Sequence, residues 1–251
     1  MTLPARTAAL PMYDLQPEAV QAWWQGLAAA LRREGVEEVP DALSWPDDLE
    51  AHWRQPRLLL SQTCGHPLVT RLWDAVQVVG AMRYAAPGCE GIRYSSLLVA
   101  REGHAGGLAA LAGRVAAVND EGSYSGCIAL RRAVAAVGGD ERFFGRITLT
   151  GSHRACLVAV RQGEADVAAI DAVTHALIQR HQPALLQGLQ VIGRTPLAPG
   201  LPLITALHTS APELRALQRG LQAACHDPAL AAERRALLIE GFEPVPASTW
   251  E

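Results

Sequence analysis

The sequence has no apolar run long enough to cross a membrane, and none that would form the core of a signal peptide. Its N-terminal stretch, MTLPARTAALPMYD, contains a single arginine and only short apolar runs. We therefore expect no membrane span and no export. As written from Met1 the chain would be cytoplasmic, and it would be periplasmic if a signal had been removed.

Paired cysteines are also missing. The five cysteines are odd in number and include no C-x-x-C pair, which disfavours a disulfide framework or a structural zinc site. We expect reduced and mostly buried thiols at Cys64, Cys89, Cys127, Cys156 and Cys225.

Motifs for metals, nucleotides and nucleic acids are absent as well. The sequence contains no H-E-x-x-H, no G-x-x-x-x-G-K-[ST] and no G-x-G-x-x-G, so neither a metal nor a cofactor is expected. A formal net charge of −3 gives no sign of the basic face that nucleic-acid binding requires. Nucleic acid is therefore not an expected partner.

What is present is a pattern of short buried strands that alternate with amphipathic helices. The chain has 251 residues, of which 49% are hydrophobic, enough for one large α/β domain or two lobes. This alternation predicts an α/β fold with mostly parallel sheets and helices on both faces. Strands are expected at 8–13, 57–61, 76–79, 91–101, 114–118, 146–150, 167–170, 189–192 and 203–206, and helices at 17–34, 47–53, from about 67, at 108–113, 123–137, 152–161, 172–180, 212–224 and 228–238.

The turns after these strands are rich in hydroxyl and amide groups. Ligands of open α/β sheets bind beyond the carboxyl ends of the strands, so these turns are the candidate binding residues. They are Tyr13, Asp14, Ser61, Gln62, Thr63, Arg83, Tyr84, the stretch 119–125, the stretch 151–153 and Asp171.

Three of these turns have features of an anion site. The segment 118–126, VNDEGSYSG, joins a strand to a helix start, where free N–H groups and serine hydroxyls favour an anion. The alternative is that Ser123 only caps the helix. His153 stands at the next helix start, where it either donates to an anion or is a surface residue. Asp171 is either a helix cap or a ligand acceptor, and the sequence does not decide between them.

Together these segments resemble the phosphonate/phosphate-binding (PhnD-like) family of ABC-transporter solute-binding proteins, within the periplasmic-binding-protein type 2 superfamily. The resemblance covers roughly residues 8–206. It rests on Ser123-Tyr124-Ser125-Gly126, on His153, and on the stretch 159–171 that ends at Asp171. Tyr13 matches an early tyrosine of the family. Two features depart from the family pattern: the loop 61–66 lacks the usual aromatic residue, and Tyr124 replaces a small hydroxyl residue.

The resemblance implies two lobes, 1–93 with 192–251 and 94–191, joined by two hinge strands that close on a ligand between them. It implies a small oxyanion ligand and a role as the substrate-binding component of an ABC transporter, with a permease as partner if the chain is exported, or else a cytosolic sensor. The implied ligand residues are Tyr13, Ser61, Gln62, Thr63, Tyr84, Ser123, Tyr124, Ser125, His153 and Asp171.

In this hypothesis, no residue is catalytic. The turn 123–125 accepts the oxyanion, His153 donates to it and becomes cationic when the ligand is bound, and Asp171 selects a protonated oxyanion or an amino-bearing ligand. Tyr13 and Tyr84 cover the carbon side of the ligand.

Two enzymatic alternatives remain. A biosynthetic enzyme on the same fold, of the menaquinone-pathway or thiamine-pyrimidine kind, is the first. The second is a hydrolytic triad of Ser125, His153 and Asp171. It is disfavoured because G-S-Y-S-G has tyrosine where a nucleophile elbow needs serine.

Overall fold

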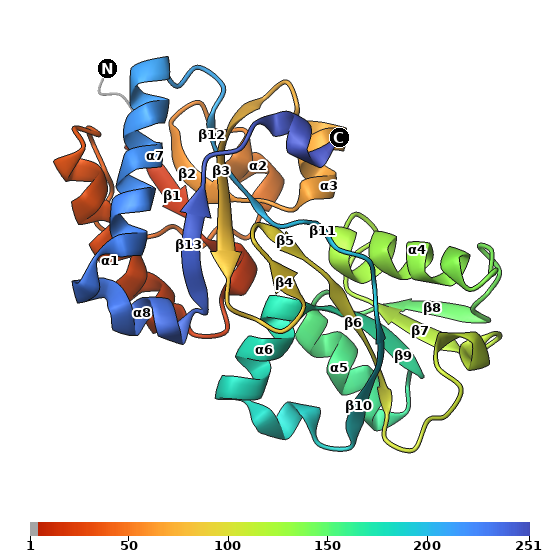
Figure 1. Ribbon diagram of the computed structural model, residues 1–251. Coiled ribbons are helices and arrows are strands. Elements are labelled where there is room, and N and C mark those ends of the chain that lie inside the picture. Colours follow the sequence, from red (N-terminus) through yellow and green to blue (C-terminus); the bar gives the residue numbers. More distant parts are fainter. Residues whose placement is uncertain (1–4) are drawn as a thin grey trace. The chain divides into compact units, whose positions relative to one another are not determined.

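The computed structural model describes residues 5–251 and divides into two compact units (Figure 1). Unit 1 consists of the described residues up to Ala85 together with Pro199–Glu251, and unit 2 is Ala86–Ala198. The chain therefore passes between the units twice. Residues 1–4, which begin the predicted first lobe and the N-terminal stretch, lie outside the described residues. The predicted lobe boundaries at 93/94 and 191/192 stay a prediction.

Unit 1 is built on a five-stranded sheet with the order β1-β2-β12-β3-β13. Strands β1 (Thr7–Ala9) and β2 (Leu58–Gln62) are parallel. Strand β12 (Pro202–Ala206) lies antiparallel between β2 and β3 (Val76–Tyr84), and β13 (Ile239–Glu243) is antiparallel to β3. The prediction of a mostly parallel sheet therefore needs a correction here, because both strands from the C-terminal segment run in the reverse direction.

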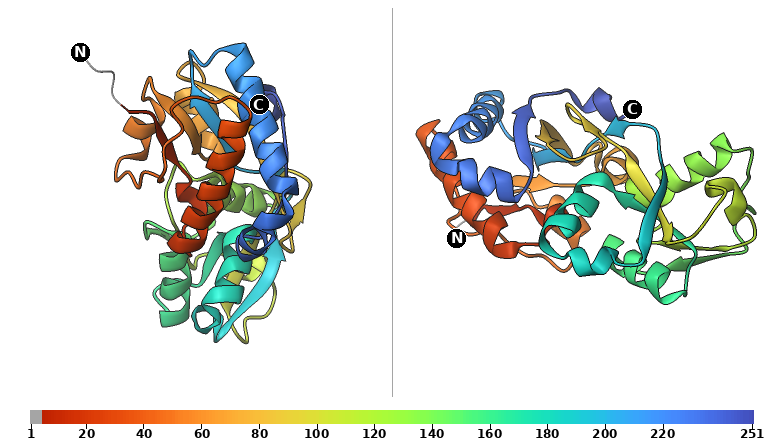
Figure 2. Two further views of the ribbon diagram at one scale, coloured as in Figure 1. Left: turned by 90° about the vertical axis from the view of Figure 1, so that its left-hand side faces the viewer. Right: turned by 60° about the horizontal axis from the view of Figure 1, so that its bottom comes forward.

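Two long helices of unit 1, α1 (Pro17–Arg33) and α7 (Ala211–His226), lie side by side (Figures 1 and 2). The inner face of α1 buries Trp23, Trp24, Leu27 and Leu31, which are at most 1% exposed, as their helical spacing predicts. Gly220 of α7 allows the close approach, because a Cβ there would lie 2.6 Å from the Leu31 side chain. The remaining helices of this unit are α2 (Leu49–Trp53), α3 (Gly65–Pro67) and α8 (Ala231–Ala236).

Unit 2 is built on a second five-stranded sheet with the order β10-β6-β9-β7-β8. Strands β7 (Val115–Val118), β8 (Arg146–Leu149) and β9 (Val167–Asp171) are parallel, whereas β6 (Ser96–Arg101) is antiparallel to both β9 and β10 (Leu189–Arg194). Helix α4 (Ala129–Ala136) covers one face, and α5 (His153–Gln162) covers the other (Figure 1). Helix α6 (Ala172–His181) follows β9 directly.

Several predicted elements have different limits in the structure. The strand predicted at 8–13 ends at Ala9, and Pro11–Tyr13 form a 3-10 turn because Pro11 has no N–H to donate to a sheet. The helix predicted at 123–137 begins as a π turn, Tyr124–Ile128, before α4. The helix predicted at 228–238 is a 3-10 turn, Pro228–Leu230, followed by α8.

Some strands lie outside the predicted strand ranges. They are β13 and two pieces of a three-stranded sheet, β11 (Ala198–Pro199) and β4 (Cys89–Glu90). The third piece of that sheet, β5 (Arg93–Tyr94), lies within the longer strand predicted at 91–101. Within the described residues, no helix is both long and apolar enough to cross a bilayer.

Candidate functional site

The strongest candidate site of unit 2 lies where three neighbouring parallel strands end. Strand β7 lies between β9 and β8, and its last residue, Val118, pairs with Leu149, the last residue of β8. Their carboxyl ends therefore meet at one edge of the sheet. The segments that leave this edge carry the predicted residues Ser123 to Ser125, His153 and Asp171.

Ser123 and Ser125 form a compact hydroxyl pair at the start of the helical segment. Ser123 is the N-cap, and its Oγ accepts the N–H of Gly126 at 3.2 Å. The Oγ atoms of Ser123 and Ser125 lie 3.5 Å apart, and both residues are buried. The cap alternative for Ser123 is therefore real. The structure adds a second hydroxyl at the same helix start.

His153 joins this pair from the next strand end. Its Nε2 lies 2.8 Å from Ser125 Oγ. Burial lowers the pKa of His153 to about 4, and the backbone of Ala169 opposes only part of that shift. The ring is therefore neutral at pH 7 in the ligand-free protein. Its Nδ1 is buried and has no side-chain hydrogen-bond partner within the described residues.

Position 126 has no room for a side chain, because Asn119 and His153 pack closely against Gly126. A Cβ at this position would lie 1.8 Å from Asn119 Oδ1 and 3.3 Å from His153 Cε1. The Oδ1 atom of Asn119 is also buried without a hydrogen-bond partner in the described part of the chain. The glycine of the S-x-S-G turn therefore allows the strand-end segments to pack closely. Its N–H donates to Ser123 Oγ.

Asp171 caps helix α6. Its Oδ1 accepts the N–H groups of Val173 at 2.8 Å and Thr174 at 3.0 Å, and the residue is 3% exposed. Of the two alternatives that the sequence left open, the cap is present.

The three residues do not have the geometry of a hydrolytic triad. Ser125 and His153 are within hydrogen-bond distance, but the Nδ1 of His153 has no hydrogen-bonded carboxylate among the described residues to orient the ring. A histidine whose pKa is about 4 is also a weak base at neutral pH.

Unit 1 gathers a second set of predicted residues. Tyr13, Gln62 and Tyr84 line one small cavity of about 20 Å³, which has room for a group the size of one water molecule. Gln62 Nε2 donates to the Tyr84 hydroxyl at 3.0 Å, and the rings of Tyr13 and Tyr84 meet edge to face, 5.0 Å apart. Trp23, interpreted from the sequence as a core residue, also lines this cavity, and its indole Nε1 has no hydrogen-bond partner in the described chain.

Ser61 and Thr63 are placed differently from their predicted neighbour Gln62. Both are fully buried. Their hydroxyls donate to the carbonyl of the following residue, at 3.4 Å for Ser61 and 3.5 Å for Thr63. Neither residue lines the cavity that Gln62 shares with the two tyrosines.

Tyr124 is held by two residues that sequence reasoning missed. Arg132 Nη1 donates to the Tyr124 hydroxyl at 2.9 Å, and the guanidinium carbon lies 5.4 Å from the ring centroid. The second residue is Tyr94 of β5, whose ring centroid lies 6.5 Å from that of Tyr124. In a regular α-helix, a residue eight positions after Tyr124 is rotated about 80° around the axis from it, so the spacing alone does not indicate this contact.

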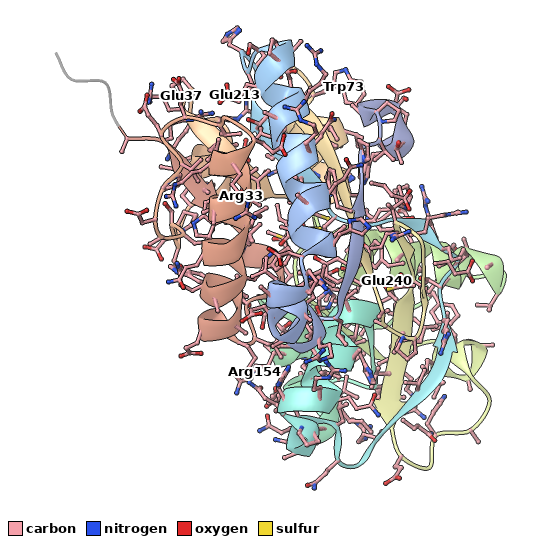
Figure 3. The ribbon with its side chains drawn as sticks, turned by 60° about the vertical axis from the view of Figure 1, so that its left-hand side comes forward. Arg33, Glu37, Trp73, Arg154, Glu213 and Glu240 are labelled. Atoms are coloured by element: carbon pink, nitrogen blue, oxygen red, sulfur yellow. The ribbon has the colours of Figure 1, made fainter. Side chains whose placement is uncertain are left out.

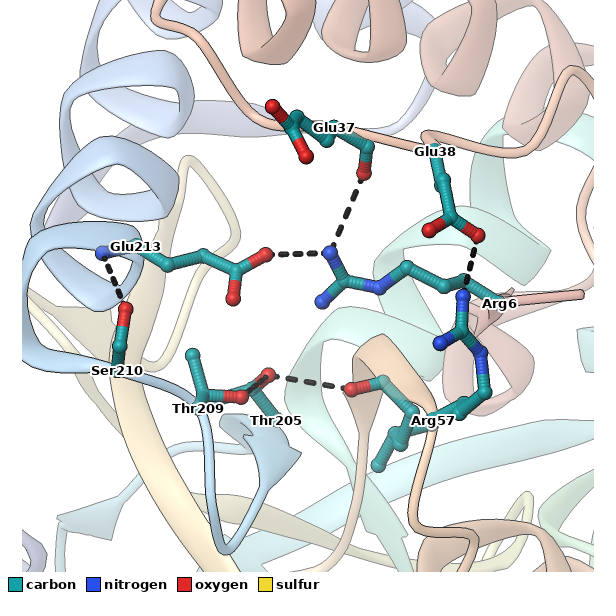
Figure 4. Close-up of polar contacts among 9 residues, drawn as sticks. Arg6, Glu37, Glu38, Arg57, Thr205, Thr209, Ser210 and Glu213 are labelled. Carbon is teal, nitrogen blue, oxygen red and sulfur yellow. Dashed lines mark hydrogen bonds and ion pairs between the residues drawn. The ribbon is translucent and has the colours of Figure 1, made fainter. Parts of the chain in front are cut away.

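A larger hollow of unit 1, about 600 Å³, lies at the amino-terminal ends of β1 and β2 and is lined by three arginines. Figure 4 shows two of them, Arg6 and Arg57. Each of them is already neutralised. Arg6 pairs with Glu213, Arg57 pairs with Glu38, and Arg219 pairs with Glu34. In Figure 3, Glu37 and Glu213 lie at the same end of the α1–α7 pair. The balanced charge disfavours an anion site in this hollow.

The remaining candidate groups are metal ligands and thiols. Among residues 5–251, no group of three or more His, Cys, Asp or Glu side chains is arranged to hold a metal ion. Within the described residues none of the five cysteines forms a disulfide, and three of them are buried. Burial raises the pKa of Cys156 and of Cys225 to about 11, so both are protonated thiols at neutral pH.

Solved structures with this fold include two phosphonate-binding proteins. PhnD1 from Prochlorococcus marinus (MIT 9301), in complex with methylphosphonate, matches with a TM-score of 0.77 at 13% identity, over 99% of this chain and 96% of that one. A binding protein component of an ABC phosphonate transporter from Pseudomonas aeruginosa matches with a TM-score of 0.76 at 17% identity, over 99% and 84%.

A sulfonate-binding protein is also similar. The alkanesulfonate-binding protein SsuA from Xanthomonas axonopodis pv. citri, bound to MOPS, has a TM-score of 0.65 at 14% identity, over 99% of this chain and 90% of that one. At such identities the likeness shows the fold, and it confirms the predicted periplasmic-binding-protein type 2 architecture. No protein of curated function matches this sequence.

Family membership comes from the sequence itself. A family model described as "ABC transporter, phosphonate, periplasmic substrate-binding protein" matches residues 10–250. This range includes both units and every predicted ligand residue. The chain therefore belongs to the phosphonate-binding family of periplasmic substrate-binding proteins of ABC transporters.

Proposed function

We propose that this protein binds a small phosphonate- or phosphate-type oxyanion at the turn Ser123–Ser125. The observation that supports the proposal is the cluster of two serine hydroxyls and His153 Nε2 at the start of the helical segment after β7. Hydroxyl donors at a helix start favour an anion, because the N–H groups and the helix dipole point toward it.

The chemistry of the cluster gives each residue a role. Ser125 exchanges its hydrogen bond with His153 for one with a ligand oxygen. The anion then raises the pKa of His153 toward neutrality, so the ring becomes a cationic donor. Asp171, with Oδ1 used in the cap, selects for an oxyanion that retains a proton, since two unprotonated anions would repel.

In unit 1, we assign the carbon side of the ligand to Tyr13, Gln62 and Tyr84. Their support is the shared cavity and the hydrogen bond between Gln62 and Tyr84. Ser61, within β2, and Thr63, directly after it, are buried, and we assign them the role of holding this strand end in place.

The partner that follows from family membership is an ABC permease. The protein then acts as the substrate-binding component outside the cytoplasmic membrane, where its family is described as periplasmic. The neighbours in complex with methylphosphonate and MOPS support a tetrahedral oxyanion as the ligand class. The comparisons give no support to the biosynthetic-enzyme alternative.

A thermal-shift panel tests the proposal. The purified protein is melted with phosphate, phosphite, methylphosphonate, sulfate and acetate, each at increasing concentration. At one hundred times Kd, a ligand stabilises the folded state by about 2.7 kcal/mol, which raises Tm by roughly 5–10 °C in a chain of this size.

Ser125→Ala and Ser248→Ala provide the matched pair for this panel. Ser125→Ala removes a donor to the anion and is expected to weaken binding by about 10- to 100-fold. Ser248 is exposed and lies in the C-terminal 3-10 turn of unit 1, so Ser248→Ala should bind like the wild type. Equal affinity in the two variants, or no rise with any phosphorus oxyanion, would overturn the proposal.

A further inference from the structure

The oxyanion turn carries a residue whose side chain is turned toward an arginine. Tyr124 lies between Ser123 and Ser125, yet its hydroxyl accepts from Arg132 and its ring packs against Tyr94. Arg132 lies on α4, and its guanidinium carbon is 5.4 Å from the centroid of the Tyr124 ring. The contact places a cation at the side chain of Tyr124, the residue between the two serines.

The charge of Arg132 is not neutralised in the structure. Within residues 5–251, Arg132 forms no ion pair with a carboxylate, in contrast to Arg101, which pairs with Asp166 in the same unit. Arg132 is exposed. A guanidinium has five N–H donors, and the bond to Tyr124 uses one of them. The remaining donors can bind a planar acceptor with two oxygens, the geometry that arginine matches best.

Arginine is the only residue type in this sequence whose side chain is a cation at all ordinary pH values. The sequence contains no lysine, so all 22 of its basic residues counted as Lys+Arg are arginines. The anchored ring of Tyr124 restricts the guanidinium, which lowers the entropy cost of using it to bind a ligand. A small hydroxyl residue at position 124 would provide no such anchor.

We propose that Tyr94, Tyr124 and Arg132 form a substituent arm that recognises a carboxylate on the organic part of the ligand. This inference rests on the proposed function, because the arm acts on a ligand whose oxyanion is held at Ser123–Ser125. It names the substrate class as phosphonocarboxylates. The same cation disfavours an aminoalkyl substituent by like-charge repulsion.

The experiment measures selectivity by calorimetry on the full chain. The ligands are phosphonoacetate, methylphosphonate and 2-aminoethylphosphonate. The wild type should bind phosphonoacetate most tightly and 2-aminoethylphosphonate most weakly, with about a tenfold ratio between the two. The ratio should shrink as salt is raised, because Arg132 is exposed.

Two adjacent arginines give a matched pair of variants. Arg132→Gln should reduce the phosphonoacetate to 2-aminoethylphosphonate ratio by about fivefold, whereas Arg131→Gln, on the same helix and also exposed, should keep the wild-type ratio. Tyr124→Phe, which removes the hydroxyl that anchors the guanidinium, should reduce the ratio in the same direction.

The outcomes separate the arm from the site itself. If the wild type binds methylphosphonate but shows no preference for phosphonoacetate, the arm is refuted and the oxyanion site stands. If Arg131→Gln and Arg132→Gln change the ratio equally, the effect is general surface charge, and the arm is refuted. If no phosphorus oxyanion binds the wild type, both the proposed function and the arm fail.

Discussion

His153, whose ring nitrogen Nδ1 is buried, shows how a single residue couples the candidate site to pH. Burial lowers its pKa from the ordinary 6.5 to about 4 in the folded protein. Between these two values the unfolded chain binds more protons than the folded chain, so the free energy of unfolding must fall as the pH falls. From pH 7 to pH 5 we expect His153 alone to account for a loss of about 2 kcal/mol.

The measurement is urea unfolding of the wild type and of His153→Gln at pH 7 and pH 5. Two other histidines, His52 and His175, also have pKa values lowered by burial, so they contribute in the same direction to both proteins. The difference between wild type and variant therefore isolates His153. Equal pH dependence in the two would show that the ring is not buried in its neutral form.

At the residue scale, local chemistry was predictable and side-chain direction was not. A serine before a helix is a common cap, so the role of Ser123 followed from its position. The fully buried Ser61 and Thr63 were chosen by the same strand-end rule as Gln62, but alternate residues of a strand point to opposite faces, and only Gln62 lines the cavity. The contact from Arg132 to Tyr124 depends on the π turn before α4, which no propensity predicts.

At the scale of elements, Asp171 connects the end of β9 to the start of α6. Replacing it with alanine leaves the N–H groups of Val173 and Thr174 without their acceptor and should cost about 1–2 kcal/mol of stability. Asp171→Asn keeps an acceptor oxygen in the same place, so it should retain most of the stability. Urea unfolding of the three proteins measures both effects.

The same pair of variants tests whether Asp171 has a role beyond the cap. In Asp171→Asn the cap survives and the negative charge does not, so the proposed discrimination against fully ionised oxyanions should weaken. Calorimetric titration with phosphate at pH 6 and pH 8 measures that discrimination. Identical affinities and identical pH dependence in Asp171→Asn would reduce the residue to a helix cap.

Elements with a clear period were predicted well, and elements that depend on distant partners were not. The buried run 167–170 and the helical spacing of Val20, Trp23 and Leu27 are visible locally. Strand β13 has no such signal. Its five residues, IEGFE, follow a helix. They form a strand because they pair with the edge of β3, which lies more than a hundred residues earlier in the sequence. Long-range pairing of this kind overrides local preference.

At the scale of the whole molecule, the two units differ in how the chain builds them. The sheet of unit 1 needs the C-terminal segment, because β12 inserts between β2 and β3 and β13 completes the edge. Unit 2 is one continuous stretch, 86–198. All five strands of its main sheet and its own buried cluster lie within that stretch. The family resemblance implied a split first lobe and a continuous second lobe. The hydrophobic pattern alone does not reveal this difference, since it depends on where the C-terminal strands pair.

The continuity of unit 2 predicts that the fragment 86–198 folds alone, with a free energy of unfolding of about 5 kcal/mol. A cooperative melt followed by circular dichroism would establish this, and an unfolded fragment would refute it.

Because the fragment contains Ser123, Ser125 and His153, phosphate at millimolar concentration should shift the amide NMR signals of residues 122–126, and Ser125→Ala should suppress the shifts. A folded fragment without those shifts would place the oxyanion elsewhere. If the fragment does bind phosphate, the ratio of its Kd to that of the full chain measures how much unit 1 adds to the affinity.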